Sequence, residues 1–201
     1  MGARFRRFLR ERFLEGNGEP VNPIHLAFRA LLLLVLFVWG WKFIVATIAS
    51  NTAGTSVLHH INLPLHEAGH VVFGWFGTLI GALGGTLMQL LFPLLFVVAF
   101  LWQRQPFGAA ACLWWLGESL MESATYINDA RDLRLVLLGG VTGKDVADYH
   151  DWQFILTRLD MLTWDHALAR LAQGTGIALL LGSAAWGGVV LWLQYRRRET
   201  T

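Results

Sequence analysis

The chain has 201 residues, of which 55% are hydrophobic and only 15% are charged. Soluble domains carry about 25% charged residues, so this composition argues against an ordinary soluble protein. The formal net charge at neutral pH is only +2. A single cysteine, Cys112, excludes an intrachain disulfide and a cysteine-based metal site.

Arginines gather at the two ends of the sequence, five of them between residues 4 and 12 and three at 196–198. Basic residues that flank apolar segments mark the cytoplasmic side of a membrane. We therefore interpret 1–25 and 196–201 as basic cytoplasmic tails, and we do not expect the arginines to bind nucleic acid.

Long uncharged apolar blocks lie between these tails, and about 20 such residues match the hydrocarbon thickness of a bilayer. The run 71–103 has no charge and is too long for one span, so we expect a break between Gly77 and Gly85 and a separate short helix that begins at Pro64. The predicted fold class is all-α: a polytopic membrane protein in the lipid bilayer of a bacterial-type inner membrane, with both termini cytoplasmic. Its single domain, 26–195, contains four spans, which we expect at 26–50, 79–102, 107–128 and 171–195. The short helix is expected at 64–76. The segment 129–165 is expected to be non-cytoplasmic and to contain an interfacial helix at 151–162.

The short helix carries the sequence His66-Glu67-Ala68-Gly69-His70. Two histidines four residues apart project from one face of a helix, at the spacing that grips one zinc ion. A glutamate beside them takes a proton from metal-bound water, whose pKa the metal lowers to about 7. The motif therefore predicts that His66 and His70 are Zn²⁺ ligands and that Glu67 is a general base.

A catalytic zinc site uses three protein ligands, so one further donor is required. Glu118, Glu122 and Asp129 share one face of the span 107–128 with Tyr126. Since Glu118 lies about 16 Å from Asp129 along the helix, Asp129 and Glu122 bracket the expected depth of the zinc ion. We favour Asp129 as the third ligand and keep Glu122, Glu118 and His150 as alternatives; a carboxylate that is not the ligand is expected to orient a ligand imidazole.

The sequence His150-Asp151-Trp152 lies on the same predicted side of the membrane. It pairs an imidazole with a carboxylate, which suits a metal ligand, a partner of a ligand, or the stabilisation of an oxyanion. The alternative is the start of a helix, with Asp151 as its cap and Trp152 as an interface anchor. We interpret His59, His60 and His166 as ordinary polar residues of loops.

In these residues the chain resembles the site-2 protease-like membrane zinc metallopeptidases, whose signature is an HExxH helix set among transmembrane helices. The resemblance covers about 64–130 and includes the glycine-rich sequence from Gly77 to Gly85. It implies that His66 and His70 are ligands and that Glu67 is the base. That family usually takes its third ligand from an Asp-Gly pair, and the sequence has none; Asp160, followed by a methionine, is the nearest remnant.

The function predicted from the sequence is therefore a zinc metallopeptidase that hydrolyses peptide bonds of peptides or membrane proteins near the membrane surface. One alternative is a non-catalytic adaptor or regulator that binds a metal without turnover. Another is a small ion transporter, in which Glu118, Glu122 and Lys42 line a polar path.

Overall fold

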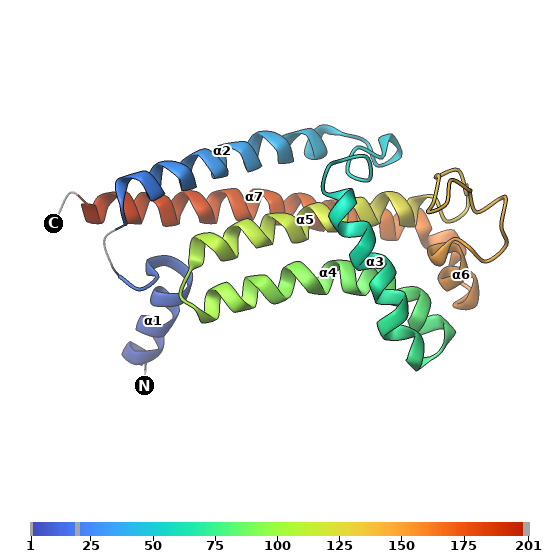
Figure 1. The fold of residues 1–201 in the computed structure, drawn as a ribbon, viewed down its shortest axis with the longest axis horizontal. Helices are drawn as coiled ribbons and strands as arrows, with labels where there is room; N and C mark the ends of the chain where they lie inside the picture. The colour runs from blue at the N-terminus through green and yellow to red at the C-terminus, as the bar shows by residue number, and fades with distance from the viewer. Residues whose placement is uncertain (1, 19–20, 199–201) are drawn as a thin grey trace. The chain divides into compact units, whose positions relative to one another are not determined.

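The computed structural model describes residues 2–18 and 21–198, and over these ranges the chain is helical without a single strand (Figure 1). The all-α prediction is therefore confirmed. The α-helices and the short helical turns between them follow in the order α1 (Gly2–Arg10), η1 (Glu11–Glu15), α2 (Pro23–Val45), η2 (Ile48–Ser50), α3 (His59–Phe73), η3 (Gly74–Phe76), α4 (Thr78–Trp102), α5 (Pro106–Asn128), α6 (Asp151–Arg158), η4 (Leu162–Trp164) and α7 (Asp165–Arg198).

Among the described residues, three helices are long and apolar enough to cross a membrane. They are α2, α4 and the continuous stretch Leu162–Arg197, which contains α7. In an apolar stretch of 18 residues in each helix, only 11% of the residues are buried in α2, against 33% in α4 and 28% in the stretch that contains α7. Because most of these apolar side chains face outward, the helices need a nonaqueous environment to cover them.

Helix α5 corresponds to the expected span 107–128, but it is not among the three apolar helices. Its C-terminal half has a polar face, and that face is buried, with Glu118 and Ser119 fully inaccessible. Polar side chains are accommodated on a buried face when they are hydrogen-bonded, as Glu118 is to Ser56 and Asn62. Three of the four expected crossings thus correspond to helices that are long and apolar enough to span a membrane, and α5 does not meet this criterion.

The other bounds differ from the expected ones in ways that local chemistry explains. Helix α3 begins at His59 instead of Pro64, so the proline lies inside it. Helix α2 ends at Val45, five residues before the expected end of the first span, and α7 extends the last span to 34 residues. The expected break after α3 occurs at Gly77, whose φ of 102° is accessible to glycine and strained for other residues.

The helices form two compact units, each with its own contacts. Unit 1 contains the described parts of Met1–Lys42, Pro93–Gly117 and Ala178–Thr201, whereas unit 2 contains Phe43–Phe92 and Glu118–Ile177. In unit 1, Ser183 of α7 donates a hydrogen bond to the carbonyl oxygen of Ala110 in α5, and Arg29 of α2 donates one to Gln194 of α7. The residues of the HExxH motif and all their partners described below belong to unit 2.

In unit 2, α3 and the first half of α4 are in contact at glycines. A Cβ atom on Gly69 would lie 2.1 Å from the carbonyl oxygen of Gly84, and one on Gly84 would lie 2.6 Å from that of Gly69. Any larger residue at either position would push the two backbones apart. The glycine between the two histidines of the motif therefore sets how closely α4 approaches them.

Candidate metal centre

His66 and His70 lie one turn apart on α3 and are held by α4. His66 is buried, and its ring occupies the space that a Cβ atom on Gly85 would need, at 2.5 Å from Nε2. His70 Nδ1 donates a hydrogen bond of 2.8 Å to the carbonyl oxygen of Gly81. This bond leaves Nε2 of His70 as the nitrogen that faces the site, as is usual for metal-binding histidines.

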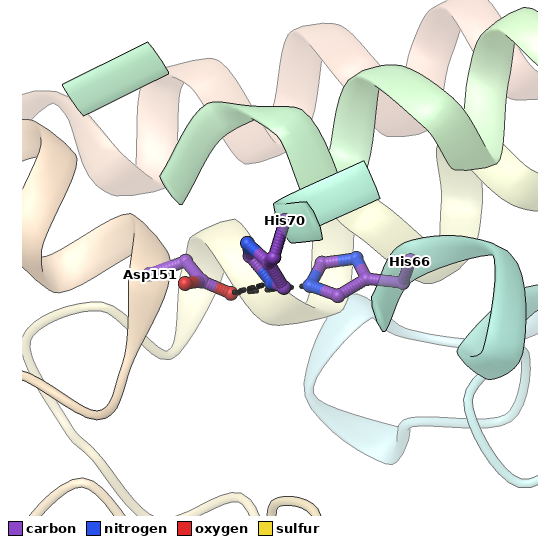
Figure 2. Close-up of side chains that lie close together, drawn as sticks. All are labelled: His66, His70 and Asp151. Atoms are coloured by element: carbon purple, nitrogen blue, oxygen red, sulfur yellow. Dashed lines mark hydrogen bonds and ion pairs between the residues drawn. The ribbon is translucent and has the colours of Figure 1, made fainter. Parts of the chain in front are cut away.

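Asp151, the first residue of α6, points its carboxylate at both imidazoles (Figure 2). Its Oδ2 lies 3.1 Å from Nε2 of His66 and 3.3 Å from Nε2 of His70. Among the described residues, these three form the one group of histidine, cysteine and acidic side chains whose ligand atoms lie within 4.8 Å of one another. The structure thus brings together two elements that are about 80 residues apart in the chain.

Two of the distances within the cluster match those expected between the ligand atoms of a zinc site, and the three ligand atoms all lie within 4.8 Å of one another. Zinc binds histidine nitrogen at about 2.0–2.1 Å and carboxylate oxygen at about 2.0–2.2 Å, so neighbouring ligand atoms of a tetrahedral site lie about 3.3 Å apart. The two nitrogen–oxygen distances in the cluster are close to that value. Two imidazoles and one carboxylate are also a recognised set of three protein ligands for catalytic zinc, with one position left for water.

Without a metal, protons hold the cluster together. The hydrogen bond that His70 donates to the carboxylate of Asp151 raises the pKa of His70 from 6.5 to about 9, against the opposing effect of burial. Burial alone would raise the pKa of Asp151, but its hydrogen bonds to His66 and His70 outweigh burial and hold that pKa well below its usual range. A metal ion would replace the shared proton, because both need the same lone pairs.

Two residues outside the cluster fix the position of Asp151. The hydroxyl of Tyr126, on α5, donates to Oδ2 of Asp151 at 3.1 Å and accepts from its backbone N–H at 2.9 Å. Trp152 donates from its indole nitrogen to the hydroxyl of Thr86 on α4. These bonds attach the start of α6 to the same helices that carry or support the histidines.

Asp129, the favoured third ligand in the sequence analysis, is not part of the cluster. Its carboxylate accepts hydrogen bonds from the backbone N–H groups of Arg134 and Leu135, both at 2.9 Å. Nε2 of the buried His150 lies 3.4 Å from its Oδ2, close enough for attraction but too long for a strong hydrogen bond. Burial raises the pKa of Asp129, but these partners outweigh it and lower the pKa below its ordinary value.

His150 is likewise not a ligand in this arrangement. It precedes α6, and its Nδ1 accepts a hydrogen bond from the backbone N–H of Gln153, which makes it the N-cap. Asp129 and His150 thus connect the end of α5 with the start of α6. The two ends of the intervening loop are held by each other, and Asp151 follows directly.

Glu118 and Glu122 form a second buried polar group with α3. Asn62 donates from Nδ2 to Glu118 at 3.0 Å and to Glu122 at 2.5 Å. His59 Nδ1 lies 2.5 Å from Glu122, and this contact raises the pKa of His59. Further bonds come from Ser56 and Gln89. The expectation that His59 is an ordinary loop residue is therefore wrong, since it begins α3 and pairs with a buried glutamate.

The signal for this second group was present in the sequence. His59, Asn62, His66 and His70 are spaced three or four residues apart, so they share one face of a helix. That face is opposite the polar face of α5, which carries both glutamates and Tyr126. The helix was expected to begin at Pro64, which would leave His59 and Asn62 outside it, whereas it begins at His59.

The cluster opens into a pocket of about 500 Å³ in unit 2. His66, His70 and Asp151 line it together with Glu67, whose carboxylate is half-buried. The irregular segment 135–139 also lines the pocket and contributes mainly apolar side chains. The pocket has the size of an ordinary ligand site, and its lining combines polar groups with apolar side chains.

Comparison of the whole chain with known protein families, with curated proteins and with solved structures gives no match. The function is therefore argued from the geometry of the site.

Proposed function

We propose that the chain is a membrane-embedded zinc metallopeptidase in which His66, His70 and Asp151 bind the metal and Glu67 is the general base. The observation that carries the proposal is the convergence of these three side chains on one point of a pocket that Glu67 also lines. The resemblance to site-2 protease-like enzymes supports it. Asp151 would take the place of the missing Asp-Gly ligand, although a tryptophan follows it.

The chain's own residues can perform peptide hydrolysis in this pocket. A bound zinc ion would supply a Lewis acid and a water molecule of lowered pKa. Glu67, which lines the same pocket, would accept a proton from the attacking water and donate it to the leaving amine. The apolar side chains of 135–139 would contact the substrate, and the two histidines are kept in orientation by Gly81 and Asp151.

The proposal also includes the membrane topology. We place α5 as a fourth crossing beside α2, α4 and α7, because its 23 residues are long enough and its polar face is buried. The arginine-rich ends then lie on the cytoplasmic side of a bacterial-type inner membrane. The short helix α3 and the loop after α5 then belong to the non-cytoplasmic side. The proposed substrate is a peptide or a membrane-anchored protein that reaches the pocket from that side.

The test replaces Glu67 with Gln in the full chain, reconstituted in proteoliposomes and incubated with solubilised membrane proteins of the host cell. New N-termini are counted by mass spectrometry, and zinc is measured in the same samples. The variant is expected to keep about one zinc per chain and to lose cleavage by at least about 100-fold, as for a lost general base. His66→Ala should lose both zinc and cleavage.

A matched control is Asp148→Asn, which neutralises another carboxylate that lines the pocket and should retain cleavage. Cleavage that survives in Glu67→Gln contradicts the mechanism. If the wild-type chain binds zinc but produces no new N-termini, it is a metal-binding regulator and not a peptidase. If flux of protons or metal ions depends on Glu118, it is a transporter, although this glutamate is already hydrogen-bonded to Ser56 and Asn62.

A further inference from the structure

The N-terminal helix α1 is amphipathic and presents an apolar face that the rest of the described chain does not cover. Phe5, Phe8 and Leu9 fall on one side of the helix at helical spacing, and their exposed fractions are 61%, 48% and 36%. Arg6, Arg7 and Arg10 occupy the other side. Exposed aromatic residues beside arginines are typical of a helix that lies in a membrane interface.

The charge of this segment is strongly positive. Residues 2–15 contain five arginines and two glutamates. Arg7 pairs with Glu11 and Arg10 pairs with Glu15, but 84% of the Arg7 side chain and 67% of the Arg10 side chain remain exposed. Exposed ion pairs of this kind hold little energy, so both arginines stay available to a stronger anionic partner.

The turn η1 anchors this helix at the ends of two membrane-capable helices in unit 1. Arg12 donates hydrogen bonds to the carbonyl oxygens of Leu101 and Trp102, the last residues of α4. The backbone N–H of Arg104 also donates to Leu101, so Arg12 completes the cap at the end of α4. Arg197, near the end of α7, donates to the carbonyl oxygen of Glu15. The helix α1 therefore adjoins the C-terminal ends of α4 and α7 through η1.

The residues at the C-terminal end of α4 are typical of a membrane surface. Trp102 at the end of α4 is 76% exposed, and the turn that follows carries Arg104, which pairs with Glu11. Tryptophan and arginine at the end of an apolar helix are the usual markers of the headgroup region. An apolar face and a set of arginines at this depth meet acyl chains and phosphate groups together.

We propose that α1 and η1 form a binding surface for anionic phospholipids, with the phenylalanine face inserted among the acyl chains and the arginines on the headgroup phosphates. The inference rests on the proposed membrane location but not on the metal centre. No residue of the pocket takes part, so zinc content and peptide cleavage report on the proposed function independently. Each arginine contributes roughly fivefold to the population of the bound helix at low ionic strength.

The test uses the full chain in nanodiscs of neutral phosphatidylcholine, or of phosphatidylcholine with phosphatidylglycerol. Amide hydrogen exchange of residues 2–15 is followed by mass spectrometry. Exchange is expected to be slower in the anionic discs, and the difference should shrink as salt is added, because the Debye length falls to about 8 Å at physiological ionic strength. The double variant Arg6→Gln/Arg7→Gln should lose roughly 25-fold of the protection, and Phe5→Ser should also reduce the protection.

The matched control is Lys144→Gln/Arg170→Gln, which removes two exposed positive charges elsewhere in the chain and should leave protection unchanged. Equal exchange in neutral and anionic discs overturns the proposal. So does protection that appears in neutral discs and rises with the number of chains per disc, because the apolar face is then covered by a second copy. Protection that requires added RNA instead of anionic lipid also overturns it.

Discussion

The hydroxyl of Tyr126 should control zinc affinity without being a ligand. Tyr126→Phe removes one oxygen and leaves the ring, which lies 4.3 Å from that of His150 between centroids and 5.9 Å from that of His66. Two hydrogen bonds to Asp151 are lost, one to its carboxylate and one from its backbone N–H. The first is charge-assisted and contributes about 1.5–3 kcal/mol, whereas the second contributes about 0.5–1.5 kcal/mol.

Only the part of this energy that orients the carboxylate affects the metal, so zinc affinity should fall by about 10- to 100-fold. The assay is competition for zinc against a chromogenic chelator, with the purified chain in detergent. Tyr149→Phe is the control, because Tyr149 also lines the pocket but donates its hydroxyl to the carbonyl oxygen of Leu138. An unchanged affinity in Tyr126→Phe, or an equal loss in both variants, would refute the argument that this tyrosine positions the ligand.

Three further predictions follow from the same geometry. Asp151→Asn should weaken zinc binding by more than about 100-fold, because it removes a proposed ligand, whereas Asp129→Asn should weaken it by at most about 100-fold. A larger loss of affinity in Asp129→Asn than in Asp151→Asn, measured in the chelator assay, would restore Asp129 as the third ligand. Gly69→Ala should destabilise the chain by about 1–3 kcal/mol through overpacking against α4, while Gly74→Ala, where a Cβ meets nothing within 4 Å, should be nearly neutral in denaturant titrations. Because the pKa of His70 is raised from 6.5 to about 9, the stability of the metal-free chain should be greatest below pH 6.5 and fall as pH rises to about 9. Zinc affinity should show the opposite trend and increase over that range by about tenfold per pH unit, because zinc binding displaces one proton. A zinc affinity independent of pH would contradict it.

Most of the fold could be predicted because apolar helices that face outward have a strong sequence signal. Helices α2 and α4 are uncharged over nearly their whole length, so their existence follows from composition. Helix α5 has a weaker signal because its polar face is buried against other parts of the chain. The start of α3 was misplaced, since Pro64 favours a first turn locally but is tolerated inside the helix that its neighbours stabilise.

The metal centre could be predicted only in part, for a related physical reason. His66, Glu67 and His70 are linked by helical periodicity, which can be read from the sequence. The third member of the cluster depends on how a long irregular loop returns to the helix, and no local rule fixes that path. Asp129 was favoured because it lies near the expected depth of the zinc ion, and depth along a helix does not show where the loop brings Asp151.

Asp129 nevertheless decides where the cluster forms. Its carboxylate binds the backbone N–H groups that follow α5 and faces His150, which in turn caps the helix that Asp151 begins. The residue at the expected depth therefore contacts the loop next to the site, and the proposed ligand Asp151 directly follows its partner His150. An acidic residue near a metal motif thus has two possible roles. The partners of its oxygens distinguish them: backbone N–H groups saturate the carboxylate of Asp129, whereas that of Asp151 receives two imidazoles whose proton a metal can replace.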